Sequence, residues 1–167
     1  MEAITVRVKR LYAVAANIDM QTALFKNAVE GISISDAHNR LNTKANHIAW
    51  LAGSLVQQRF ETVNLFTGNN ELKQQADDLF KDFQGIKDDV TYPSFEQYLA
   101  DWDKISPILK AEIENAESAK LDSKIEFPEM TITVLEMLTF VMYREANHIG
   151  QIALWRRLLG YEPMKYM

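Results

Sequence analysis

The stretch that decides the fold is TVLEMLTFVMYREANHIGQIALWRRLLG, residues 133–160. Its apolar residues recur at the three- and four-residue spacing of a helix that buries one stripe. This stripe consists of Val134, Leu138, Val141, Ile152, Trp155 and Leu159. Glu145 and His148 fall where the stripe continues, and Arg144 lies one helical turn before His148. Because unpaired buried polar groups are costly, we expect these side chains to line a polar pocket.

The rest of the chain predicts three more long helices, from Val6 to Val29, from Asn46 to Phe66, and from Ser94 to Ile113. Residues 71–83 predict a short helix in the connection between the second and third. The best strand-like segment, residues 125–127, is too short to anchor a sheet. Four amphipathic helices with two longer connections predict an all-α fold, a four-helix bundle with short extra helices in its connections.

Length and composition limit the class of protein. A chain of 167 residues predicts a single domain, residues 1–167. The net charge of −5 argues against nucleic acid as a partner, because phosphate binding needs a basic face. The absence of cysteine excludes disulfides and thiolate ligands. No apolar run reaches the length of a membrane span and no signal-peptide core is present, so we expect no membrane partner and a cytoplasmic location.

Two segments together resemble the DinB/YfiT-like superfamily: ANHIAWLAGSL, residues 45–55, and YREANHIGQIALWRRLLG, residues 143–160. The resemblance covers essentially the whole chain and implies a four-helix bundle that is often a homodimer. Many members of that superfamily hold a divalent metal with one histidine from the second helix and two from the fourth, a site that can activate water or a thiol. They include thiol-dependent transferases and isomerases, and proteins assigned as metal-dependent hydrolases.

By this resemblance the three ligand positions fall on Ser54, Arg144 and His148. Only His148 keeps the ligand type, since serine is a poor ligand for zinc or nickel and arginine is cationic and cannot coordinate. A guanidinium would also repel a dication. We therefore expect no metal cofactor, and keep as the alternative a zinc or nickel ion bound by an altered ligand set in which water or a carboxylate fills the vacated positions.

The candidate pocket residues are Ser54, Arg144, Glu145, His148 and Gln151, with His47 and Trp50 as candidates for its rim. Arg144 is expected to clamp a carboxylate or phosphate of a ligand, to form a salt bridge with Glu145 or Glu136, or to be exposed to solvent. His148 is either a surviving ligand or a core histidine. A desolvated neutral His148 would have a lowered pKa, whereas pairing with Glu145 would raise that pKa. His47 either reaches the pocket mouth or is an exposed residue at a helix end.

Three hypotheses of function follow. The favoured one is a diverged, metal-free member of the superfamily that binds a small, anionic molecule in the bundle pocket. The second is a metal-dependent hydrolase or thiol transferase with an altered ligand set. The third is a non-catalytic interaction protein that dimerises. No nucleophile–base–acid arrangement or phosphate-binding glycine loop is visible in the sequence, so no catalytic residue is assigned.

Overall fold

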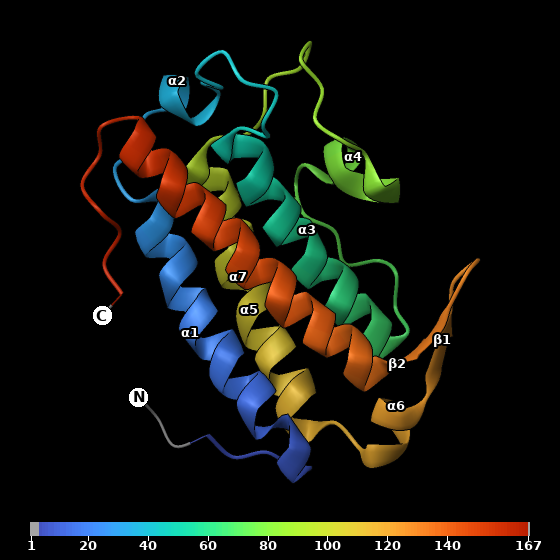
Figure 1. Ribbon diagram of the computed structural model, residues 1–167. Coiled ribbons are helices and arrows are strands. Elements are labelled where there is room, and N and C mark those ends of the chain that lie inside the picture. The colour runs from blue at the N-terminus through green and yellow to red at the C-terminus, as the bar shows by residue number, and fades with distance from the viewer. Residues whose placement is uncertain (1–3, 167) are drawn as a thin grey trace.

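Four long helices form the body of the protein. A computed structural model describes residues 4–166, so residues 1–3 and 167 of the predicted domain lie outside the described residues. The long helices are α1 (Tyr12–Val29), α3 (Ile48–Thr67), α5 (Phe95–Asn115) and α7 (Val134–Leu158), seen side by side in Figure 1. The all-α four-helix bundle predicted from the sequence is confirmed.

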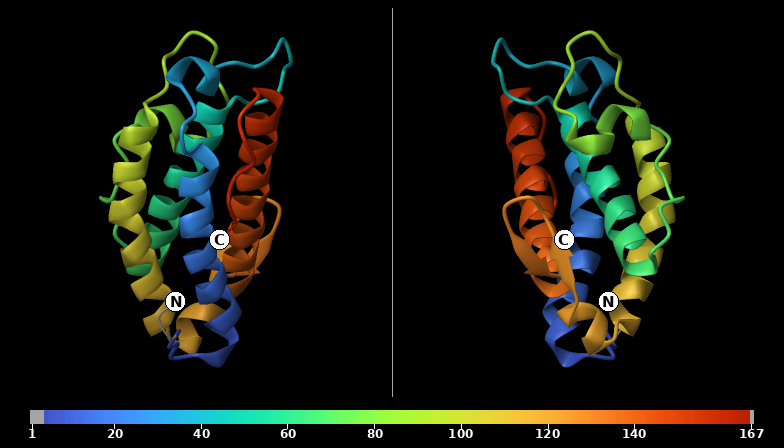
Figure 2. Two further views of the ribbon diagram at one scale, coloured as in Figure 1. Left: turned by 90° about the vertical axis from the view of Figure 1, so that its left-hand side faces the viewer. Right: turned by 90° about the vertical axis from the view of Figure 1, so that its right-hand side faces the viewer.

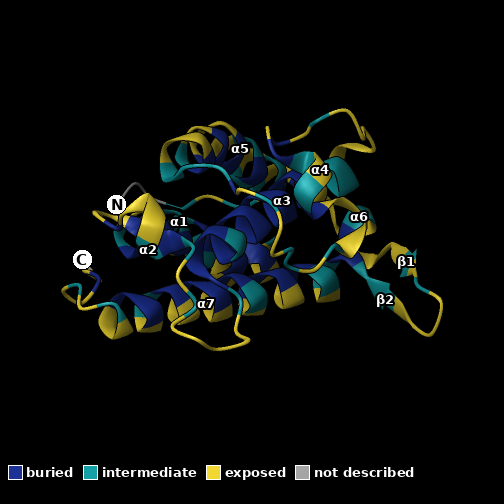
Figure 3. Cartoon of the chain, turned by 90° about the horizontal axis from the view of Figure 1, so that it is seen from above, coloured by how far each residue is buried: buried dark blue, intermediate teal, exposed yellow. Residues whose placement is uncertain are grey.

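Each long helix packs against two others. Helix α3 contacts α5 and α7, and α1 contacts the same two helices, which closes the bundle around one core. The two side views of Figure 2 show the elongated bundle, and the view from above in Figure 3 shows the buried residues on the sides of the helices that face one another. The largest fully buried side chains include Trp102, Arg59 and Tyr98. An arginine in this set marks a polar feature at the centre of the core.

Helix ends follow local capping rules, with one difference from expectation. Ser94 caps α5, and Thr133 caps α7 in a capping box with Glu136. Helix α3 was expected to begin at Asn46, but its N-cap is His47, whose Nδ1 accepts a hydrogen bond from the backbone N–H of Trp50. A neutral imidazole nitrogen can therefore satisfy a free helix N–H, as a hydroxyl or carboxylate oxygen does elsewhere.

Short elements lie before α1 and in the connections between the long helices. These are the 3₁₀ turn η1 (Lys9–Leu11), α2 (Ile34–Ala37), α4 (Asp77–Phe80), η2 (Lys81–Phe83), α6 (Ser118–Asp122), and the strands β1 (Lys124–Glu126) and β2 (Thr131–Thr133). The helix expected over residues 71–83 is thus reduced to α4 and η2. The strand-like segment at 125–127 contributes to an antiparallel hairpin in which Ile125 pairs with Ile132, ahead of α7 (Figure 1). Within residues 4–166, no helix has the length and hydropathy needed to cross a membrane.

Gly53 of α3 permits a close approach from two aromatic side chains. A Cβ atom at this position would collide with the ring of Phe80 and the hydroxyl of Tyr98. Both aromatic residues are buried, so they have little room to move aside. Glycine at position 53 therefore lets α4 and α5 pack directly on the backbone of α3.

Candidate functional site

Arg144 joins α7 to α3 through hydrogen bonds. Its Nη2 donates to Oγ of Ser54 at 2.6 Å, and its Nη1 donates to Oε1 of Gln58 at 2.5 Å and weakly to the backbone oxygen of Ser54 at 3.5 Å. The structure thus brings Ser54 and Arg144 together, as the resemblance to the DinB/YfiT-like superfamily implied. The expected alternative of a salt bridge to Glu145 or Glu136 is not what Arg144 forms, because Glu136 caps α7 and Glu145 bonds elsewhere.

The charge of Arg144 is poorly compensated. The side chain is half-buried, and its acceptors are neutral oxygens. Burial lowers the pKa of Arg144, and the more distant charges of Glu61 and Glu145 only partly oppose this effect. A guanidinium has five N–H donors. The three bonds leave its Nε–H and one Nη2–H without a protein acceptor among residues 4–166.

His148 lies one helical turn after Arg144 and is 9% exposed. Its Nδ1 is 3.0 Å from the backbone oxygen of Arg144. Since a carbonyl oxygen only accepts, Nδ1 carries the proton and Nε2 is the unprotonated ring nitrogen. Burial, and then the neighbouring guanidinium, lower the pKa of His148 from 6.5 to about 4. Of the two alternatives for the pKa of His148, the structure agrees with the lowered pKa of a neutral, desolvated ring, because Glu145 pairs with Arg59 instead.

Trp50 of α3 faces His148 across the helix interface. Their ring centroids are 6.2 Å apart and their planes differ by 29°. Nε1 of Trp50 and Nε2 of His148 are both buried and have no hydrogen-bond partner in the described part of the chain. Trp50 precedes Ser54 by four residues, and Arg144 precedes His148 by four, so the Trp50–His148 contact and the Ser54–Arg144 contact lie about 6 Å apart along the helices. We call Trp50, Ser54, Gln58, Arg144 and His148 the α3–α7 cluster.

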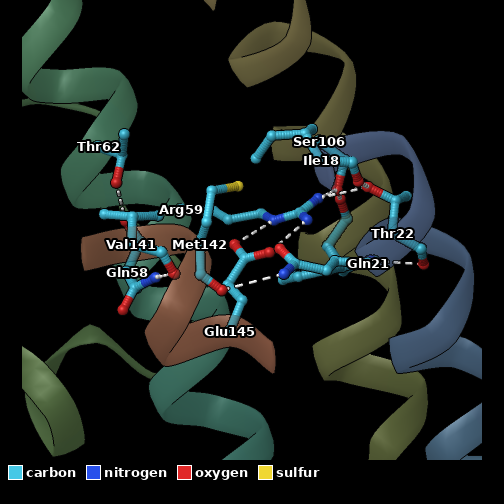
Figure 4. Close-up of polar contacts among 11 residues, drawn as sticks. Ile18, Gln21, Thr22, Gln58, Arg59, Thr62, Ser106, Val141, Met142 and Glu145 are labelled. Atoms are coloured by element: carbon cyan, nitrogen blue, oxygen red, sulfur yellow. Dashed lines mark hydrogen bonds and ion pairs between the residues drawn. The ribbon is translucent and has the colours of Figure 1, made fainter. Parts of the chain in front are cut away.

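Glu145 lies at the centre of the bundle and pairs with Arg59 of α3 (Figure 4). Nε and Nη2 of Arg59 donate to Oε1 and Oε2 of Glu145, each at 2.8 Å, and both side chains are 0% exposed. The structure therefore places Glu145 in the core, apart from the partners of Arg144. Arg59 was not predicted, although the sequence carries a signal for it: it is four residues after Leu55 and four before Val63, on the apolar stripe of α3.

Arg59 connects all four long helices. Its Nη1 donates to Oγ1 of Thr22 in α1 at 2.7 Å and to Oγ of Ser106 in α5 at 2.6 Å, as Figure 4 shows. Its guanidinium carbon lies 3.5 Å from the ring centroid of Trp102. A buried ion pair contributes to stability only when its hydrogen bonds are satisfied, and these contacts meet that requirement.

Comparison of the sequence with models of known protein families assigns the chain to a family. The model of the DinB family matches residues 42–166. The chain belongs to the DinB family. The matched region of this DinB-family protein contains both helices of the α3–α7 cluster and the whole of α5. No curated protein matches the chain.

The residues at the three positions that the superfamily resemblance assigns to metal ligands do not form a three-histidine set. Two of the three corresponding positions hold Ser54 and Arg144, and the guanidinium of Arg144 bonds directly to the hydroxyl of Ser54. His148 offers one free ring nitrogen, but the positively charged guanidinium of Arg144 lies close enough to lower its pKa. Among residues 4–166, no three histidine, aspartate or glutamate side chains are grouped so that they could hold a metal ion.

The structure places Gln58 in the α3–α7 cluster in place of the predicted Gln151. Gln151 is exposed and donates to Oδ1 of Asn147 at 2.6 Å, so the structure does not bring it to the α3–α7 cluster. Gln58, which the sequence analysis missed, is buried and accepts from Arg144. The signal that could have identified Gln58 is its position four residues after Ser54, on the same face of the same helix.

His47 is buried rather than exposed at a helix end. It is 6% exposed, and its ring centroid lies 5.1 Å from that of His38 and 5.0 Å from that of Tyr92. Burial, and then the nearby His38, lower the pKa of His47 from 6.5 to about 4. A neutral ring is what the cap requires, because Nδ1 must keep its lone pair to accept from the N–H of Trp50. His47 thus contributes to the site by fixing the start of α3.

Proposed function

We propose that this DinB-family protein binds a small anion at Arg144, without the three-histidine metal site of the family. One observation carries the proposal: a half-buried guanidinium is bonded to neutral oxygens and keeps two N–H groups without a protein acceptor. A partly desolvated charge whose hydrogen-bond acceptors are all neutral is unfavourable, so pairing with an anion is favoured. A carboxylate matches the planar guanidinium well.

The charge of the cluster favours a monoanion. Arg144 supplies one positive charge, and His148 is neutral at pH 7 because its pKa is lowered to about 4. The carboxylate of Glu61 lies close enough to influence the pKa of Arg144, and it would repel a second negative charge. A carboxylate therefore suits this site better than a phosphate dianion.

Isothermal titration with sodium acetate, and with inorganic phosphate as a second probe, tests the proposal in buffer that contains a chelator. We expect saturable acetate binding to the wild-type protein, and its loss in Arg144→Gln. Arg157→Gln is the matched control, because Arg157 is exposed in the last turn of the same helix and is expected to be without effect. A folded wild-type protein that binds neither probe would refute the anion site.

The metal-free part of the proposal has a separate test. Titration with zinc and nickel salts without chelator is expected to give no stoichiometric binding. Saturable 1:1 binding that His148→Ala abolishes would instead support the alternative, a metal-dependent hydrolase or thiol transferase with an altered ligand set.

We also propose a homodimer, supported by the outer face of α7. Four large apolar side chains on this face are each more than half exposed: Phe140, Tyr143, Leu154 and Leu158. Asn147 and Gln151 lie between them, and no charged residue interrupts the stripe. Two antiparallel copies of α7 would place Phe140 against Leu158, and Tyr143 against Leu154. Light scattering on the wild-type protein and on Leu154→Glu tests this proposal. We expect a wild-type dimer that the substitution converts to a monomer, and a wild-type monomer would contradict the proposal.

The cytoplasmic location expected from the sequence stays a prediction.

A further inference from the structure

The α3–α7 cluster contains two buried polar atoms of complementary type. Nε2 of His148 is an unprotonated nitrogen and can only accept a hydrogen bond, whereas the indole Nε1–H of Trp50 can only donate one. Neither has a partner within residues 4–166. Buried polar atoms normally have hydrogen-bond partners, so a pair left open beside Arg144 points to a ligand group.

The position of the pair defines which group fits. The Trp50–His148 contact lies one helical turn from the Ser54–Arg144 contact, on the same interface between α3 and α7. A hydroxyl group can donate to one nitrogen and accept from the other at the same time. We infer that the anion bound at Arg144 carries a hydroxyl group that donates to Nε2 of His148 and accepts from Nε1–H of Trp50, so that the ligand is a small hydroxy acid. This inference rests on the anion site proposed above.

Other ligand groups satisfy the pair less well. An ammonium group donates to His148, but it has no lone pair for Trp50, and its charge would lie near the guanidinium of Arg144. A methyl group would leave both nitrogens unsatisfied, which is costly in a buried site. The site is therefore expected to select hydroxy acids over amino acids and over simple carboxylates of the same size.

Titration of the full-length protein with glycolate, acetate and glycine tests the inference. The three probes share a carboxylate and differ in the group on the neighbouring carbon. In the wild-type protein we expect glycolate to bind about tenfold more tightly than acetate, which corresponds to about one satisfied buried hydrogen bond. Glycine is expected to bind no better than acetate.

Variants of His148 separate the hydroxyl from the anion site. In His148→Phe the preference for glycolate over acetate is expected to disappear, because the ring no longer offers an acceptor nitrogen to the hydroxyl group. His148→Gln keeps an acceptor oxygen and is expected to restore part of the preference. Circular dichroism establishes that each variant folds. The ¹⁵N chemical shift of Nε2 in the wild-type protein provides a readout that needs no variant, and it is expected to move with glycolate but not with acetate.

Each outcome distinguishes the inference from the function on which it rests. If none of the probes binds, the anion site itself is refuted and the hydroxyl assignment with it. If glycolate and acetate bind equally and both require Arg144, the anion site stands and the hydroxy-acid inference is overturned. A preference for glycolate that persists in a folded His148→Phe, or a glycine affinity equal to that of glycolate, also overturns it.

Discussion

Replacing Glu145 with glutamine is expected to destabilise the bundle strongly, because it leaves the charge of Arg59 buried without a counter-charge. Both side chains are 0% exposed and share two hydrogen bonds of 2.8 Å. Breaking a buried ion pair by removing one partner costs about 3–5 kcal/mol. Glutamine retains one acceptor oxygen, and Arg59 keeps its bonds to Thr22 and Ser106, so we expect the lower end, about 3 kcal/mol. For a chain of this size that loss lowers the melting temperature by about 6–12 °C.

Urea unfolding followed by far-UV circular dichroism measures the effect, provided that the m-value is unchanged. Glu117→Gln is the matched control. Its ion pair with Arg7 has a similar distance of 2.9 Å, but the two side chains are 61% and 62% exposed. Exposed pairs contribute less than about 1 kcal/mol, so this variant is expected to change stability little.

A double replacement separates the lost pair from the buried charge. Arg59→Met with Glu145→Leu removes both charges and leaves apolar side chains of similar size, so it is expected to be more stable than Glu145→Gln. If Glu145→Gln costs no more than Glu117→Gln, the reasoning about an uncompensated buried charge is wrong. If the double variant is no more stable than Glu145→Gln, the loss arises from packing instead.

Three further predictions concern pH, a glycine pair and a helix cap. The free energy of unfolding is expected to fall as the pH drops from about 6.5 to about 4. The reason is that His47 and His148 stay neutral in the folded protein, where their pKa values are about 4, but bind protons in the unfolded chain. Urea titrations at pH 7 and pH 5 measure this free energy, and equal values at the two pH values would contradict the prediction. Gly53→Ala is expected to cost about 1–3 kcal/mol, because a Cβ collides with the two aromatic side chains packed on it. Gly150→Ala has open space and is expected to stabilise α7 by about 0.5–1 kcal/mol, so thermal melts of the two variants should shift in opposite directions. Ser94→Ala removes the N-cap of α5 and is expected to cost about 1 kcal/mol in the same assay.

The sequence was sufficient to predict the helices and much of the cluster. Apolar periodicity depends on residues three and four apart, so the chain itself specifies which face of α7 is buried. Capping is equally local: the start of α5 was predicted at Ser94, which caps the helix, and Thr133 caps α7 through Glu136 only three residues further on. The proximity of Ser54 to Arg144 was expected from the resemblance to the DinB/YfiT-like superfamily, and the structure joins them by a hydrogen bond of 2.6 Å.

The sequence could not assign the partners of the charged residues. Arg144 and Glu145 are adjacent on α7, yet Arg144 bonds to Ser54 near the edge of the bundle, and Glu145 bonds to Arg59 at its centre. Successive residues of a helix point about 100° apart, so neighbours in the chain face different helices. The α3 residue that each of these two side chains contacts therefore depends on how α3 is rotated and shifted against α7.

The sequence by itself therefore determined that this chain is a four-helix bundle and which apolar stripes of its helices face inward, because both follow from short-range periodicity. Only the tertiary structure decided that Glu145 is neutralised by Arg59, 86 residues away, and that Arg144 is left with neutral partners. The physical reason is that an ion pair depends on distances of a few ångströms between helices, which packing sets and local sequence does not encode.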